Sequence, residues 1–427
     1  MRVEALDQEG RGVAHLDGKV IFIEGALTGE TVEYVSFQRK PSYELAQAKR
    51  IIRASVSRVQ PRCRYFGVCG GCSMQHLEPR AQVAAKQRVL EDNLARIGKV
   101  APETILSPVH GPAWQYRYRA RFSARHVAKK GTLVGFRELR SSFVVDMQTC
   151  EVVPARISAL LVPLRELIAS LSIRERLPQV ELAIGDAVDV LVLRVIEPPD
   201  DADLGRLREF AIRHRVQLML QPKGPESVYP LFPEQVIPLQ YRIPDFDLTF
   251  PFDATDFTQV NHEINRVLVR RAITLLDPQP GERIADFFCG LGNFSLAIAR
   301  RGAQVLGVEG NARLVQRAHG NAVLNGLETQ CRFLDRDLFR ITVQDWKALA
   351  PFDRILIDPP RDGAMELVKA LGELPPARIV YVSCNPATLA RDAAVLVNVH
   401  GYRLVAAGVI NMFPHTSHVE SIAQFER

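Results

Sequence analysis

The apolar residues follow a different pattern in the C-terminal part of the chain than at the N-terminus. From about residue 250 onward, apolar runs alternate with helical stretches, as in ADFFCGLGNFSLAIA, and later runs end in FDRILIDPP and RIVYVSCNP. Apolar strands that alternate with helices are typical of a parallel, doubly wound sheet. The pattern therefore predicts a Rossmann-like α/β domain over residues 251–427.

The first 55 residues show another pattern. The stretch GRGVAHLDGKVIFIEGALTGETVEYVSF alternates short apolar runs with glycine-containing turns, which predicts a small antiparallel barrel or sandwich over residues 1–55. The end of this unit is basic, because the segment 37–64 has only one acid, Glu44. Its basic residues are Arg39, Lys40, Lys49, Arg50, Arg53, Arg58, Arg62 and Arg64.

The middle of the chain, residues 56–250, combines both patterns and predicts an α+β domain. Apolar residues recur at helical spacing over 79–100, which predicts a helix that ends at Gly98. The stretch 114–140 predicts a strand, a turn and a second strand. The proline-rich stretch 229–246 resembles a linker or an irregular connection.

Composition narrows the class of protein. The 427 residues are 47% hydrophobic, with a formal charge of +6 and a pI near 9.0. Each domain can therefore bury a core, and the clustered basic residues favour a nucleic-acid partner. No apolar stretch approaches the ~20 residues that span a bilayer, and MRVEALDQEG lacks the apolar core of a signal peptide. We expect a soluble, cytoplasmic and monomeric protein without a membrane partner.

Glycines and acidic side chains stand at the ends of the predicted strands. Gly290 and Gly292 follow the first strand, so the backbone there can approach a ligand closely. Glu309 ends the next strand, where an acid can bind both hydroxyls of a ribose. Asp358 ends a later strand, at the carboxyl edge where open α/β sheets bind ligands.

Two positions bear on the choice of cofactor. Ser295 occupies the third position of the dinucleotide fingerprint, where NAD-binding proteins carry Gly or Ala. Asp286 lies inside the first strand, shortly before the glycines. Acidic strand ends suit the positively charged sulfonium of S-adenosylmethionine, which has no pyrophosphate to cradle.

A thiol stands at the end of another strand of the same series. In RIVYVSCNPATLARD the apolar run stops at Ser383 and Cys384, and the chain turns at Asn385 and Pro386. Such a thiol is either a packing residue or a nucleophile held over a pocket. Its place among the acidic strand ends favours the nucleophile.

Five motifs resemble those of the RNA uracil-C5 methyltransferases over roughly residues 250–427: DFFCGLGNFSL, VEG, LIDPPR, VYVSCNPATLARD and MFPHTSHVES. The resemblance implies a class I methyltransferase that uses S-adenosylmethionine, with Cys384 as the nucleophile and Glu420 as the base. It also implies cofactor contacts from Gln259, Phe288, Asn293, Glu309, Asp337 and Asp358. His415 and His418 lack an evident third metal ligand, so we expect them to support the pocket.

The chemistry explains why a thiol and a base are needed together. Uracil C5 is a poor nucleophile, and a thiolate that adds at C6 turns the ring into an enolate whose C5 can attack a methyl group. A base must then remove the C5 proton so that the thiolate can leave. Because a free Cys has a pKa of about 8.5, the site must favour the thiolate.

Seven cysteines, an odd number, argue against a disulfide framework. Cys63, Cys69 and Cys72 lie close together in CRYFGVCGGCSMQHL, and Cys150 is a plausible fourth ligand. Four thiolates suit either tetrahedral zinc or an iron–sulfur cluster, and the spacing does not separate the two. The family resemblance favours a [4Fe–4S] cluster with a structural role in the central domain.

RNA binding is expected in two places. The stretch YRYRARF places Arg117, Arg119 and Arg121 on one face of a strand, with aromatic residues between them. The N-terminal unit looks like a TRAM domain, an OB-like RNA-binding barrel. The barrel, the cysteine cluster and the methyltransferase motifs together resemble the branch of the family that methylates 23S rRNA, and the target uridine must leave its stack in a single-stranded or loop region.

Three alternatives stay open. The enzyme could methylate a different rRNA or tRNA uridine. An amino-group methyltransferase is a second alternative, although Arg361 follows the two prolines where those enzymes often have an aromatic residue. The third is a non-catalytic iron–sulfur RNA-binding protein.

Overall fold

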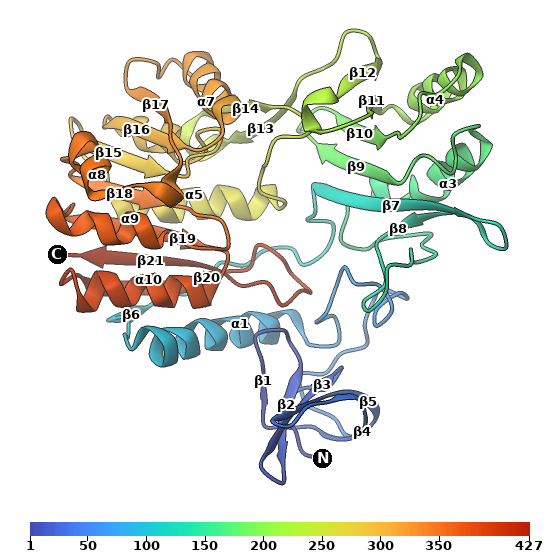
Figure 1. The fold of residues 1–427 in the computed structure, drawn as a ribbon, viewed down its shortest axis with the longest axis horizontal. Coiled ribbons are helices and arrows are strands. Elements are labelled where there is room, and N and C mark those ends of the chain that lie inside the picture. Colours follow the sequence, from blue (N-terminus) through green and yellow to red (C-terminus); the bar gives the residue numbers. More distant parts are fainter.

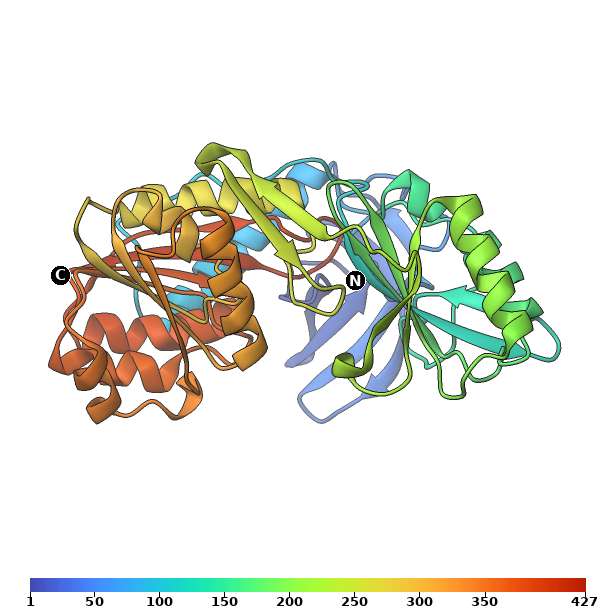
Figure 2. The same ribbon diagram turned by 90° about the horizontal axis from the view of Figure 1, so that it is seen from above.

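The computed structural model describes residues 1–427, which form four sheets with helices packed around them (Figure 1). A five-stranded sheet lies at the N-terminus, a six-stranded sheet in the middle of the chain, and an eight-stranded sheet mainly in the C-terminal part. A two-stranded hairpin lies between the last two (Figure 2). None of the helices has the length and apolar character needed to cross a membrane.

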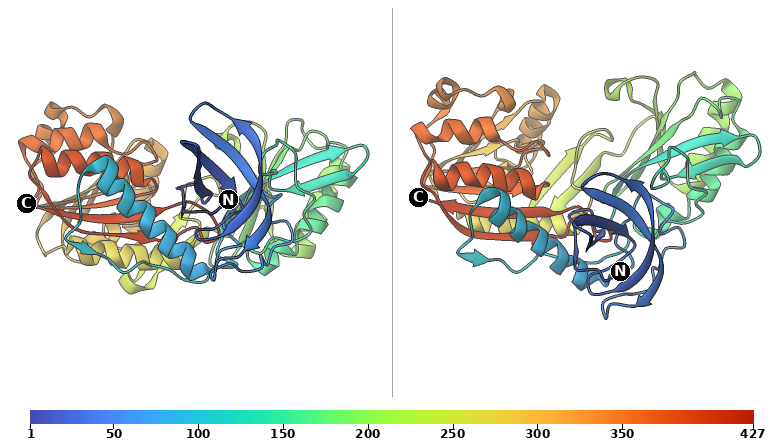
Figure 3. Two further views of the ribbon diagram at one scale, coloured as in Figure 1. Left: turned by 90° about the horizontal axis from the view of Figure 1, so that it is seen from below. Right: turned by 60° about the horizontal axis from the view of Figure 1, so that its bottom comes forward.

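The N-terminal sheet has the strand order β1-β2-β3-β5-β4, with β3 and β5 parallel. Val3 N donates to Glu30 O (2.8 Å) and Val32 N donates to Met1 O (2.8 Å), so the start of the chain bonds to the start of β4 and curves the sheet toward closure. In Figure 3 this sheet, coloured blue, lies where the other two units meet. The strands are β1 Ala5–Leu6, β2 Gly12–Leu16, β3 Lys19–Glu24, β4 Thr31–Arg39 and β5 Tyr43–Arg53.

The central sheet has the order β12-β11-β10-β9-β7-β8 and confirms the predicted strand–turn–strand over 114–140 as the hairpin of β7 and β8. Its strands are β7 Arg119–Val127, β8 Gly131–Gly135, β9 Gln179–Ile184, β10 Asp189–Arg194, β11 Gln217–Gln221 and β12 Tyr229–Phe232. Its helices are α2 Ala155–Ser158, α3 Leu161–Ser170, α4 Asp201–His214 and the 3₁₀ turn η2 Pro225–Ser227.

The proline-rich stretch 229–246 is not the irregular connection that the sequence predicted. It contains β12 and also β13 (Leu239–Ile243), which pairs with β14 (Leu248–Phe252); the 3₁₀ turn η3 (Pro244–Phe246) joins them. Pro230 lies in β12, which is the edge strand of its sheet. A proline is tolerated there because an edge strand needs no second row of ladder hydrogen bonds.

The eight-stranded sheet has the order β17-β16-β15-β18-β19-β21-β20-β6, and the predicted Rossmann-like pattern is confirmed. The first five strands in this order are parallel, whereas β21 runs antiparallel to both of its neighbours. The strands are β6 Thr104–Ile105, β15 Arg283–Phe287, β16 Gln304–Glu309, β17 Cys331–Asp335, β18 Arg354–Ile357, β19 Arg378–Ser383, β20 Arg403–Ile410 and β21 Glu420–Glu426. The helices around it are α5 His262–Leu276, α6 Ser295–Ala299, α7 Ala312–Leu324, α8 Val343–Leu349, α9 Met365–Ala370 and α10 Pro386–Asn398, with the 3₁₀ turns η4 Leu338–Arg340 and η5 Leu371–Glu373.

Each face of this sheet has its own core, because successive residues of a strand point to opposite faces. In β19, Val380 packs into the cluster that contains α5 and α6, whereas Ile379 packs into the cluster that contains α1, α9 and α10. Both faces are thus covered, as the continuous apolar runs of these strands require.

The helix predicted over 79–100 consists of α1 (Pro79–Asn93) and one π-helical turn, η1 (Leu94–Gly98). Its contacts are with α10 and β20, and β6 extends the eight-stranded sheet beside β20. At Gly98 a Cβ atom would lie 2.7 Å from the carbonyl oxygen of Ala390, so only glycine permits this approach. The predicted domain division placed this segment in the central unit, whereas its packing is with the C-terminal sheet.

Candidate active site

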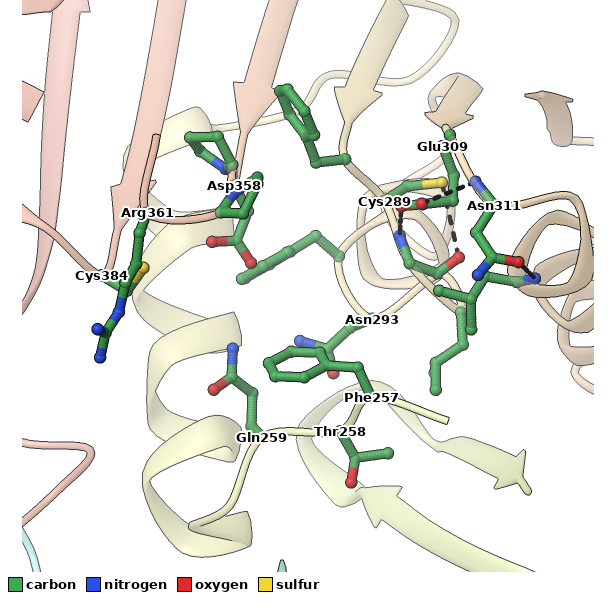
Figure 4. A pocket seen from close by; sticks show the side chains of 18 of the residues that line it. Phe257, Thr258, Gln259, Cys289, Asn293, Glu309, Asn311, Asp358, Arg361 and Cys384 are labelled. Carbon is green, nitrogen blue, oxygen red and sulfur yellow. Dashed lines mark hydrogen bonds between the residues drawn. The ribbon is translucent and has the colours of Figure 1, made fainter. Parts of the chain in front are cut away.

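A cavity of about 770 Å³ opens at the carboxyl ends of the parallel strands. Figure 4 shows Cys384, Asp358 and Arg361 on one side of it, with Glu309 and Asn311 on the other. All eight residues that the sequence assigned to catalysis or cofactor binding line this one cavity. They are Gln259, Phe288, Asn293, Glu309, Asp337, Asp358, Cys384 and Glu420.

The loop after β15 is held in a strained conformation on the floor of the cavity. Phe288 has a φ of +64°, a left-handed value that side chains rarely adopt, and Gly290 follows at +55°. The carboxylate of Glu309 accepts hydrogen bonds from Gly290 N (3.1 Å) and Asn311 N (3.0 Å). Glu309 therefore fastens the loop and still has lone pairs for a ligand.

Asp286 lies behind this loop and does not line the cavity. Its side chain is fully buried and accepts a hydrogen bond from Ser295 Oγ at 2.5 Å, while its other oxygen has no partner. Burial raises the pKa of Asp286 to about 7. The serine that departs from the dinucleotide fingerprint thus binds the acid of the first strand.

Asn293 is fixed by two side chains that the sequence did not single out. Its Oδ1 accepts hydrogen bonds from Tyr241 Oη (2.8 Å) and Asn265 Nδ2 (3.0 Å), and its Nδ2 donates to Asn265 Oδ1 (3.0 Å). One amide hydrogen of Asn293 remains for a ligand. Tyr241 comes from β13, in the stretch 229–246 that the sequence predicts to be a linker. The pattern of prolines and apolar residues there gives no sign of this contact.

The pairing of β19 with β21 brings Cys384 and Glu420 together. Ser383 pairs with Ser421 in the antiparallel register, so Cys384 and Glu420 follow as the next pair outward. The chain turns at Asn385, whose Oδ1 accepts a hydrogen bond from Ala387 N (3.1 Å) and caps α10. The thiol is therefore held between the end of β19 and the N-terminus of α10.

Acidic groups crowd the thiol. Burial, with Glu420 and Asp358 nearby, raises the pKa of Cys384 to about 11, while Arg361 opposes this rise. Burial also raises the pKa of Glu420 to about 8 and that of Asp358 to about 7. The cavity thus contains a thiol and carboxyl groups whose charge states depend on each other.

Arg361 and His418 lie together on one side of the cavity, where Arg361 supplies the positive charge. Arg361 Nη2 lies 3.0 Å from His418 Nδ1, and the His418 ring lies against Phe413 at 5.1 Å between centroids. Burial and the adjacent guanidinium lower the pKa of His418 to about 4, so the ring is neutral. His415 lies elsewhere, buried against Trp114, and unlike His418 it does not line the cavity.

The loop 411–419 between β20 and β21 is held by the N-terminal half of the chain. Ser73 N donates to His415 O (2.9 Å), and His415 N donates to Gln82 Oε1 (2.8 Å). The ring of Trp114 stacks on His415 with 3.8 Å between centroids. Ser73 directly follows Cys72 of the cluster, so the cysteine segment is hydrogen-bonded to the loop that leads to Glu420.

The four clustered cysteines line one small cavity, together with Phe66, Phe136 and Met147. The cysteines are Cys63, Cys69, Cys72 and Cys150. Burial raises the pKa of Cys69 to about 11 and that of Cys72 to about 12, and a cationic metal centre would remove this penalty because coordinating thiols are deprotonated. No three His, Cys, Asp or Glu side chains stand close enough to share a single ion.

The expected basic face of β7 is not a shared exposed surface. Arg119 is largely buried and donates to Ala254 O (2.8 Å), and Arg121 pairs with Glu181 (2.9 Å). Tyr118 N donates to Val260 O (2.7 Å). These contacts tie the central sheet to the segment that carries Gln259, so this strand positions a wall of the cavity.

The fold and the cavity define a Rossmann-like methyltransferase, and comparisons with known proteins identify the family. The family model described as tRNA (Uracil-5-)-methyltransferase matches residues 78–427. The chain belongs to this family of RNA uracil-C5 methyltransferases.

Several relatives match along their whole length. A protein of Nitrosospira multiformis named 23S rRNA (uracil(1939)-C(5))-methyltransferase RlmD is 62% identical and covers 100% of this chain and 98% of its own. A protein of the same name from Cupriavidus necator is 58% identical and covers 100% of both chains. A solved structure, Pyrococcus abyssi tRNA (uracil-54, C5)-methyltransferase in complex with S-adenosyl-L-homocysteine, shares the fold with a TM-score of 0.75, 24% identity, and coverage of 100% of this chain and 99% of its own.

Proposed function

We propose that this chain transfers a methyl group from S-adenosylmethionine to C5 of one uridine in 23S rRNA, the position that its relatives' names give as 1939. The observation that carries the proposal is that Cys384 and Glu420 each lie next to the last register pair of β19 and β21, Ser383 and Ser421, and line one cavity together with several acids. Full-length relatives at 58–62% identity support the choice of 23S rRNA.

The cavity suits S-adenosylmethionine as the methyl donor. Glu309 presents a carboxylate where ribose hydroxyls bind at the end of a second strand, and Asn293 offers a fixed amide hydrogen. Phe288 and Phe339 lie 5.7 Å apart between centroids and provide an apolar wall for an adenine ring. Gln259, Asp337 and Asp358 complete the lining. The bound donor supplies an electrophilic methyl group.

The protein side chains act on the uracil ring. The sulfur of Cys384, deprotonated to the thiolate, forms a bond to C6, and the electrons of the C5–C6 double bond move toward O4. C5 then takes the methyl group as the bond between the methyl carbon and the donor's sulfonium breaks, and the donor leaves as a neutral thioether. Glu420 takes the proton from C5, the double bond re-forms, and the sulfur leaves as a thiolate. Arg361 stabilises negative charge on the sulfur, since it opposes the rise in the thiol pKa.

The other two units support RNA binding in this proposal. The N-terminal sheet has the 1-2-3-5-4 strand order and the closing contacts of a five-stranded OB-like barrel of the TRAM type. The four cysteines would hold a [4Fe–4S] cluster, which four thiolates lining one small cavity can ligate. The cluster would be structural, in a three-unit, monomeric enzyme divided near residues 55 and 250.

Mapping the product tests the proposed function. We expect the purified protein, S-adenosylmethionine and a 23S rRNA transcript to yield 5-methyluridine at one site, found by nuclease digestion and mass spectrometry. A transcript with that uridine changed to cytidine should stay unmethylated, and a tRNA transcript serves as the competing substrate. Methylation of the tRNA alone would favour the family's other substrate class, and methylated amino groups would contradict the proposal.

Replacing Cys150 by alanine is expected to remove most of the bound iron and to lower the Tm by about 5 °C or more, because a metal centre contributes its binding energy to folding. Anaerobic purification, metal analysis and visible absorbance measure the first effect, and thermal unfolding measures the second. Cys331→Ala, which lies in β17 away from the cluster, should keep its iron. Zinc in place of iron, or full iron in Cys150→Ala, would contradict the ligand assignment.

A further inference from the structure

A lysine from the N-terminal half of the chain is buried beneath the active-site loop. Lys86 lies on the inward face of α1 and is 2% exposed. Its Nζ donates to Asn411 Oδ1 (2.8 Å) and to Phe413 O (2.8 Å). Because Phe413 lines the catalytic cavity, the ammonium group holds one of its walls from behind.

The ammonium group also lies near Glu420 in the sheet, because it binds Asn411, which directly follows Ile410, the β20 residue paired with Glu420. The two side chains form no direct ion pair, but the positive charge of Lys86 favours the ionised carboxylate, and the carboxylate favours the charged lysine. Burial opposes both charges: it lowers the pKa of Lys86 to about 7 and raises that of Glu420 to about 8. The other titratable or charged groups that face this pair are Asp358, Arg361, Cys384, His415 and His418.

Lys86 both binds the segment 411–413 and carries a positive charge that favours the ionised form of Glu420. Arg361 is the other cation that favours ionised Glu420, but its guanidinium is turned to His418 and the thiol. A buried lysine without a role would be costly, since an ammonium group loses its hydration on burial. Here two carbonyl oxygens and a nearby carboxyl offset that cost.

We propose that Lys86 is a positioning residue for the base, whose ammonium group holds the segment 411–413 and favours the ionised form of Glu420 for removal of the C5 proton. This inference rests on the proposed function and adds a residue that does not touch the substrate. A proton-accepting Glu420 must be ionised when the C5 proton leaves, so the rate of that step should rise with pH until the carboxyl is fully ionised.

The test measures release of tritium from RNA that carries 5-tritiated uridine, in single turnovers from about pH 6 to about pH 9.5. Lys86→Met removes both the hydrogen bonds and the charge, whereas Lys86→Gln removes the charge and still offers amide hydrogens, one bond nearer the backbone, toward the two carbonyls. We expect both variants to release tritium about 10-fold more slowly at neutral pH and to recover at high pH, because the profile moves up by about one unit. Lys86→Arg should restore the profile.

Arg88→Met serves as the matched control, because Arg88 lies on the solvent-facing side of the same helix; its profile should equal that of the wild type. A wild-type profile in Lys86→Gln would overturn the inference, even if Lys86→Met fails to fold. A uniform loss in Lys86→Gln at every pH would also overturn it, since that indicates a packing role alone. Failure of the wild type to methylate any RNA would instead refute the proposed function.

Discussion

Replacing Cys384 by alanine is expected to lower methyl transfer to RNA by at least about 10⁴-fold, because the cavity's other thiol, Cys289, lies beside Glu309 on the opposite side from Arg361 and Asp358. The variant should still bind S-adenosylmethionine, since the thiol is not needed to hold the donor. Incorporation of labelled methyl groups into the rRNA transcript measures the first quantity, and calorimetric titration measures the second.

Cys331→Ala is the control for a buried thiol outside the cavity, and its methyl transfer should stay close to that of the wild type. Residual transfer in Cys384→Ala within about 10-fold of the wild type would rule out a covalent mechanism. It would also favour an amino-group methyltransferase, which needs no cysteine nucleophile.

Replacing Glu420 by glutamine is expected to trap the RNA on the enzyme. The amide cannot accept the C5 proton, so the methylated ring stays bonded to the sulfur, and turnover falls by about 10³-fold. Electrophoresis under denaturing conditions should show a protein–RNA complex that depends on S-adenosylmethionine and that the wild type does not accumulate.

Asp358→Asn is the comparison for this experiment, because Asp358 is another buried carboxyl with a raised pKa in the same cavity. We expect it to weaken cofactor binding without accumulation of the complex. Release of methylated RNA from Glu420→Gln at the wild-type rate would show that another group removes the proton.

The sequence predicted the parts of the site that depend on strand ends. Parallel strands share one carboxyl edge, so Glu309, Asp358 and Cys384 had to approach each other once the strands were recognised. The cysteine cluster could also be predicted, because Cys63, Cys69 and Cys72 lie close together in the chain. Local spacing and the order of strands were sufficient in both cases.

Other contacts could not be predicted because they join segments far apart in the chain. The register of β19 against β21 brings Glu420 to the same end of the sheet as Cys384; no local pattern encodes that register, and only the family resemblance indicated Glu420. Tyr241 and Lys86 came from a presumed linker and from a helix assigned to another unit. Arg119 shows the opposite error, since a basic strand pattern suggested an RNA surface where the side chain bonds to Ala254.

The most direct test is to locate the covalent bond itself. Glu420→Gln is incubated with S-adenosylmethionine and the rRNA transcript, the RNA is digested, and the protein peptides are sequenced by tandem mass spectrometry. We predict one peptide with a methylated uridine nucleotide on the sulfur of Cys384. Methylated RNA together with an unmodified Cys384 peptide, or a nucleotide attached to a different residue, would contradict the account.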